Sequence, residues 1–141
     1  MEISRPIAMT TMHCRYEGGL RCVSVHESSG TVLHTDAPLD NQGRGESFSP
    51  TDLVATALAS CILTILGIVA ERENISLDPC TATVHKTMTA TGVRRIALLE
   101  VWITLPPGLT EEQRRKLQRA GEGCPVKRSL EGCVAMELHW H

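Results

Sequence analysis

The uncharged run from Leu53 to Ala70 constrains the fold more than any other feature of this chain. A membrane-spanning helix needs about 20 predominantly apolar residues, so the run is at the short limit for a span. Threonine, serine, glycine and four alanines dilute it, Asp52 and Glu71 flank it, and no cluster of lysine or arginine orients it. The sequence therefore predicts a core helix over residues 50–72 instead of a membrane span.

This helix has no polar face. Apolar side chains surround Cys61 on one side of the helical wheel, and others such as Ile62 and Leu66 lie elsewhere. A helix that is apolar all round has to be covered on every side, and a chain with only 3% aromatic residues has little bulk to do so. We therefore expect a homodimer in which a second copy of the helix packs against the first.

Composition indicates one domain spanning residues 1–141, with 42% hydrophobic residues available for a core. A net charge of −2 and a pI near 6.3 give no electrostatic basis for binding nucleic acid or an acidic membrane surface. Residues 1–10 lack the apolar stretch of an export signal. Six cysteines without such a signal indicate a reducing compartment, so we expect a cytoplasmic protein with free thiols.

The order of predicted elements is that of an α+β domain. Turn signals at Gly18-Gly19 and at residues 28–30 separate three strands, and a polar loop precedes the long helix. Two more strands, a polar helix, a short helix and a last strand follow. Their predicted limits are strands over 11–17, 20–26 and 31–36, a loop over 37–48, two strands joined at Thr91-Gly92, helices from Thr110 and after Cys124-Pro125, and a strand ending near Trp140.

Cys61 has two interpretations. Free cysteine is among the most buried residue types and behaves as a small hydrophobe, and apolar surroundings disfavour the reactive thiolate. A reactive Cys61 therefore needs a cation from another segment, and the first hairpin offers Arg15 and Arg21.

The turn predicted at Gly18-Gly19 would pair Arg15 with Cys22. Alternation along the strands then places Arg15 and Arg21 on opposite faces, so only one of them can point at a given site. It also separates Cys14 from Cys22, which argues against a disulfide between them.

Cys124 precedes a proline at the predicted start of a short helix. Backbone N–H groups and the helix dipole at such a position favour a thiolate, although an ordinary N-capping cysteine fits the same pattern. Two thiols with activating features indicate a dithiol redox pair, and since there is no CxxC motif the fold has to bring Cys61 and Cys124 together.

Four segments carry a resemblance to a known family. SPTDLVATALASC and GCPVKRSL contain the two cysteines, RRIALLEVWITLPPGLTEEQRRKL lies between them, and YEGGLRCVSVHESSGTVLHTDAP opens the chain. Together they resemble the OsmC/Ohr family of hydroperoxide-reducing proteins, in its less characterised branch, from about Tyr16 to the end.

The resemblance implies antiparallel sheets wrapped around long central helices in an intertwined homodimer. It implies Cys61 as the peroxidatic thiol, Cys124 as the resolving thiol and Arg21 as the residue that holds the thiolate. The family's hydroperoxidases orient this arginine with a glutamate at the position of Thr51. Candidate replacements in this chain are Asp52 and Glu46.

The implied activity is thiol-dependent reduction of organic, lipid-like hydroperoxides in oxidative stress defence. An external dithiol would restore the thiols, and the chemistry requires no metal or organic cofactor.

Two other functions compete with this one. The first is a non-catalytic binder of apolar ligands at the dimer interface. The second is a metal-binding protein that uses Glu137, His139 and His141, with Cys133 at the start of the same strand face. Because no CxxC or HxxxH spacing is present, a solvated strand face is the favoured interpretation of these residues.

Overall fold

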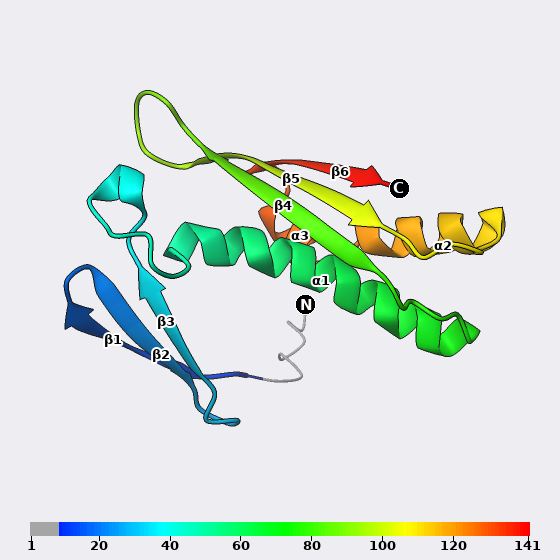
Figure 1. Ribbon diagram of the computed structural model, residues 1–141, viewed down its shortest axis with the longest axis horizontal. Helices are drawn as coiled ribbons and strands as arrows, with labels where there is room; N and C mark the ends of the chain where they lie inside the picture. The colour runs from blue at the N-terminus through cyan, green and yellow to red at the C-terminus, as the bar shows by residue number, and fades with distance from the viewer. Residues whose placement is uncertain (1–8) are drawn as a thin grey trace, which may run out of the picture. The chain divides into compact units, whose positions relative to one another are not determined.

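The computed structural model describes residues 9–141 (Figure 1). It forms two compact units, an amino-terminal unit of Met1–Pro50 and a carboxy-terminal unit of Thr51–His141, and each is described by itself. Residues 1–8, part of the stretch in which the sequence predicts no export signal, lie outside the described residues. The predicted order of helices and strands is confirmed, with one added 3₁₀ helix, Leu39–Asn41, inside the predicted loop.

The amino-terminal unit is a three-stranded antiparallel sheet. Its strands lie in the order β1-β2-β3. Their bounds are β1 Met12–Gly18, β2 Arg21–His26 and β3 Val32–Asp36.

The first hairpin turns one residue later than predicted. Gly19 and Leu20 both have positive φ angles, 62° and 64°, as the central residues of a tight hairpin turn require. The strand pairing shifts just after Tyr16, which lies opposite Cys22 instead of Arg21. The predicted register is therefore wrong by one residue, because an irregularity in β1 takes up the extra position.

This shift reverses two predictions about the faces of the sheet. Arg15 lies opposite Val23. Val23 is two residues from Arg21 on β2 and therefore points to the same face of the sheet. The two arginines thus share a face instead of occupying opposite ones. In the same way Cys14 shares a face with Cys22, and both thiols are free.

The carboxy-terminal unit packs helices against one face of a second three-stranded sheet (Figure 1). Strands β4 and β5 are antiparallel, whereas β5 and β6 are parallel, so this sheet is mixed and not purely antiparallel as the family resemblance implied. The chain reaches β6 through two helices, a crossover of the kind that parallel strands need. The bounds are α1 Pro50–Glu73, β4 Thr81–Met88, β5 Ile96–Thr104, α2 Glu111–Glu122, α3 Pro125–Leu130 and β6 Ala135–Trp140.

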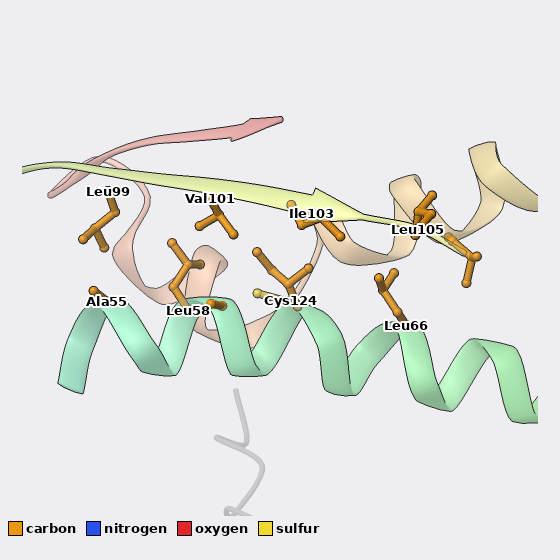
Figure 2. Close-up of a cluster of buried hydrophobic side chains, with 11 residues drawn as sticks. Ala55, Leu58, Leu66, Leu99, Val101, Ile103, Leu105 and Cys124 are labelled. Carbon is orange, nitrogen blue, oxygen red and sulfur yellow. The ribbon is translucent and has the colours of Figure 1, made fainter. Parts of the chain in front are cut away.

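The core of this unit lies between α1 and β5 (Figure 2). Residues four apart on α1 share a face, and three of them are fully buried, as are three alternate residues of β5. These are Leu58, Ile62 and Leu66 on α1 and Leu99, Val101 and Ile103 on β5.

By length and composition α1 could cross a membrane, with 33% of its most apolar window buried within the structure. The fully buried leucines show instead that one face of α1 serves as the core of this unit. The other face is exposed along a row that we call the open face of α1, Ala57, Ser60, Thr64 and Ile68.

Capping side chains start the two later helices. Thr110, where the sequence predicts the helix to begin, forms a reciprocal capping box with Gln113 at α2. The sulfur of Cys124 caps α3 and Pro125 is its first residue, so the predicted helix start is confirmed.

Candidate active site

The two predicted redox cysteines meet within the carboxy-terminal unit. Cys61 is half-buried on α1, and Cys124 is completely buried at the start of α3. The Cys61 thiol is close enough to Cys124 to raise the pKa of Cys124, and Figure 2 shows the Cys124 sulfur beside α1 between Leu58 and Leu66. Because both cysteines are free, the structure has this site in its reduced, dithiol form.

Opposing effects act on the pKa of the Cys124 thiol. The backbone N–H of Lys127 donates to its sulfur at 3.4 Å, which favours ionisation. Burial is the larger effect and raises the pKa of Cys124, and the neighbouring Cys61 thiol raises it further. The backbone N–H groups at the helix start thus favour ionisation as expected, but desolvation has the larger, opposite effect on the pKa of Cys124. A protonated Cys124 can donate its S–H to Cys61.

Arg21 lies in a cluster of charges in the amino-terminal unit. Its guanidinium contacts Glu46 Oε2 at 2.9 Å and Asp36 Oδ2 at 3.4 Å. The contact with Asp36 follows from the β2–β3 pairing, in which Arg21 and Asp36 are directly opposite. The cluster borders a hollow of about 330 Å³, which is also lined by Glu17 and His34.

Asp36 is a residue that our sequence reasoning missed. It is only 1% exposed and holds the loop and the strand together, because the backbone N–H of Glu46 donates to its Oδ2 at 3.0 Å. This hydrogen bond, with the charge of Arg21 as a further cause, holds the pKa of Asp36 below its usual range. The observed β2–β3 register pairs Arg21 with Asp36, whereas a turn of residues 28–30 alone would have placed Arg21 opposite Ala37, so the sequence pattern did not single out Asp36.

The other candidate acid, Asp52, has a different ion-pair partner. Lys86 from β4 contacts the Asp52 carboxylate at 2.8 Å and also donates to the Thr51 hydroxyl at 2.8 Å. Glu46 is thus the sequence-predicted acid that contacts Arg21 within its own unit.

The fold and the paired thiols define a class of proteins, and comparison with known proteins names it. Residues 43–139 match the family described as OsmC-like protein, and the chain belongs to that family. No match was found among curated proteins.

Solved structures agree with this assignment. A protein of Psychrobacter arcticus 273-4, described as an osmotic stress induced and detoxification response protein, is 40% identical with a TM-score of 0.87, covering 95% of this chain and 97% of its own. The organic hydroperoxide resistance protein OsmC of Legionella pneumophila is 20% identical with a TM-score of 0.76, covering 96% and 98%. The organic hydroperoxide resistance protein OhrB of Bacillus subtilis is 18% identical with a TM-score of 0.71, covering 96% and 100%, and these two share the fold.

Proposed function

We propose that this protein reduces organic, lipid-like hydroperoxides with its own thiols, as part of oxidative stress defence. The observation that carries the proposal is the contact between Cys61 and Cys124, two thiols far apart in the sequence that one chain holds together in the reduced state. The relatives named as detoxification and organic hydroperoxide resistance proteins support the same class of substrate.

The reaction has two steps at sulfur. The Cys61 thiolate attacks the distal oxygen of the hydroperoxide, the O–O bond breaks, and the leaving alkoxide takes a proton to become an alcohol. Cys61 is then a sulfenic acid. The Cys124 thiol condenses with it, forming the Cys61–Cys124 disulfide and releasing water.

Arg21 supports the first step in this proposal. A guanidinium stays charged at any relevant pH, and an opposite charge within about 4–6 Å favours an ionised group. Glu46 and Asp36 hold Arg21 in one orientation through the contacts described above, so we assign them as positioning residues. The approach of Arg21 to Cys61 is part of the proposal and rests on the family resemblance.

The remaining parts of the cycle come from outside the chain. An external dithiol reduces the disulfide by exchange and restores both thiols. We propose a cytoplasmic homodimer that works without a metal or organic cofactor in this reaction and without nucleic acid or membrane partners.

The disulfide provides the test. One equivalent of an organic hydroperoxide should link Cys61 to Cys124 within a chain and leave Cys14, Cys22, Cys80 and Cys133 reduced, as peptide mapping by mass spectrometry would show. Cys124→Ser should accumulate Cys61 sulfenic acid instead, and Cys80→Ser, the matched control, should behave like wild type. A dominant bridge between any other pair would overturn the assignment.

A Cys61→Ser variant distinguishes hydroperoxide reduction from non-catalytic binding of apolar ligands. If the protein only binds apolar molecules, Cys61→Ser should retain every activity of the wild type. Complete loss of hydroperoxide consumption in Cys61→Ser, with its fold intact, would exclude that alternative.

A further inference from the structure

Three potential metal ligands meet on the face of the second sheet that is turned away from the core. Since side chains alternate along a strand, Glu100 points to the opposite side from the buried Leu99 and Val101. Glu100 lies directly across from Glu137 in the parallel β5–β6 ladder. His139 follows two residues after Glu137 and therefore shares its face.

The ligand atoms of these three residues are close together. His139 Nε2 is 3.9 Å from Glu100 Oε2 and 3.8 Å from Glu137 Oε2, and all three ligand atoms lie within 4.8 Å of one another. These separations are too long for hydrogen bonds. Nε2 is nevertheless buried from solvent and has no hydrogen-bond partner among the described residues. This ring nitrogen thus faces two carboxylates.

Aromatic packing holds the imidazole in this orientation. The ring of Trp102 stacks on His139 with centroids 5.1 Å apart and an interplanar angle of 21°. On the other side of Trp102, His85 lies with its ring centroid at 4.6 Å. His85 is near the cluster but is not one of its three ligand residues.

We propose that Glu100, Glu137 and His139 form a binding site for a divalent first-row transition-metal ion such as Zn²⁺. Zinc binds imidazole nitrogen and carboxylate oxygen at about 2.0–2.2 Å, so neighbouring ligand atoms around it are about 3.4 Å apart. The observed 3.8 and 3.9 Å need only small side-chain rotations to reach that spacing. The imidazole favours such an ion over magnesium or calcium, which prefer oxygen ligands.

The ion would also remove an unfavourable arrangement. Like charges directly opposite on neighbouring strands are destabilising, and the Glu100–Glu137 pair is such a case. A divalent cation between them neutralises both carboxylates and links β5 to β6. Three protein ligands leave a fourth position for water. The site differs from the cluster considered from sequence, since Glu100 joins it and neither Cys133 nor His141 does.

Titration of the full chain with Co²⁺ at neutral pH tests the site, because the absorption spectrum of bound Co²⁺ depends on the atoms that coordinate it. Binding should quench the fluorescence of Trp102, which stacks on a ligand, and added Zn²⁺ should reverse the quenching. The second tryptophan, Trp140, points to the other face and bonds Glu122. The visible absorption should indicate oxygen and nitrogen ligands, without the intense ultraviolet band of cobalt bound to thiolate.

Matched variants complete the test. His139→Gln and Glu137→Gln should each weaken cobalt binding at least tenfold in calorimetry, about 1.4 kcal/mol. His85→Gln, the same change on the other side of Trp102, should bind like wild type. Glu100→Gln provides a third ligand variant should either of the first two fail to fold. A thiolate band, equal affinity in His139→Gln, or no binding up to about 1 mM would overturn the proposal.

Discussion

Arg21 is held by two carboxylates of different character. Asp36 is buried and fixed by a backbone hydrogen bond, whereas Glu46 is exposed on the loop that follows β3. A guanidinium held by two carboxylates loses little freedom when it meets an anion, which would suit the proposed role of Arg21 beside the Cys61 thiolate. Arg15 shares the sheet face but makes no ion pair among the described residues.

We predict that Arg21→Ala slows the oxidation of Cys61 by organic hydroperoxide about tenfold or more and moves the pH–rate profile to higher pH. The reason is that loss of a neighbouring positive charge disfavours the reactive anion. Stopped-flow oxidation across pH measures both effects. Arg15→Ala is the control and should keep the wild-type profile; equal rates for wild type and Arg21→Ala would remove Arg21 from the site.

Asp36 should link stability to pH. Its pKa is lowered in the folded protein, so its contribution to stability is fully present above the unfolded value of about 3.9 and is lost as the pH falls through the folded value. Asp36→Asn should therefore destabilise the protein at pH 7, and its difference from wild type should shrink as the pH falls below about 4.

Urea unfolding at several pH values measures this difference. Glu112→Gln, an exposed acid on α2, is the control and should match wild type throughout. A deficit for Asp36→Asn that stays constant down to the lowest pH would contradict the assignment of a lowered pKa.

Among the elements, α2 depends most on its cap. It is a polar helix with Leu117 and Gly121 as its buried residues, so packing stabilises it less than it stabilises α1. The Thr110 hydroxyl accepts from the Gln113 N–H at 3.1 Å, and the Gln113 side chain accepts from the Thr110 N–H at 2.9 Å. Both hydrogen bonds satisfy N–H groups that the helix itself leaves without partners.

Thr110→Ala should lower the free energy of unfolding by about 1 kcal/mol, because it leaves the N–H of Gln113 without its partner. Thr110→Ser keeps the hydroxyl and should cost much less. Chemical denaturation of both variants gives the comparison, and an alanine variant as stable as the serine variant would show that the cap contributes nothing.

At the scale of the whole molecule, the described part of the amino-terminal unit has no apolar core of its own. Within residues 9–50, the buried side chains are polar: Thr35, Asp36 and Ser49. In the other unit, Ile68 on the open face of α1 is 42% exposed. A three-stranded sheet without a buried apolar face is not stable alone, so these surfaces favour the expected homodimer, in which both units of the chain would act as one domain.

We therefore predict a dimer that does not dissociate without unfolding. Ile68→Glu should give monomers or unfolded protein, because it puts a charge on the open face of α1. Val93→Glu, the same kind of change at a side chain that is 83% exposed in the β4–β5 loop, should leave the dimer intact. Sedimentation at micromolar concentration is the measurement, and a stable folded monomer of the wild type would contradict the prediction.

The sequence by itself determined the element order, the long apolar helix and the starts of α2 and α3. These features depend on local physics. The periodicity of apolar residues, a threonine with glutamine three residues later, and a cysteine followed by proline each act within one or two turns of chain. The family resemblance added the proposed roles of Cys61 and Cys124 as peroxidatic and resolving thiols.

Only the tertiary structure decided the register of the first hairpin, the partners of Arg21 and the raised pKa of Cys124. Leu20 adopts a positive φ that its side chain disfavours, so no local pattern predicted the shifted turn. Asp36 and Glu46 reach Arg21 through strand pairing and a loop. The pKa of Cys124 rises because α1 and α3 remove its sulfur from water, and desolvation depends on what packs around a group rather than on its neighbours in sequence.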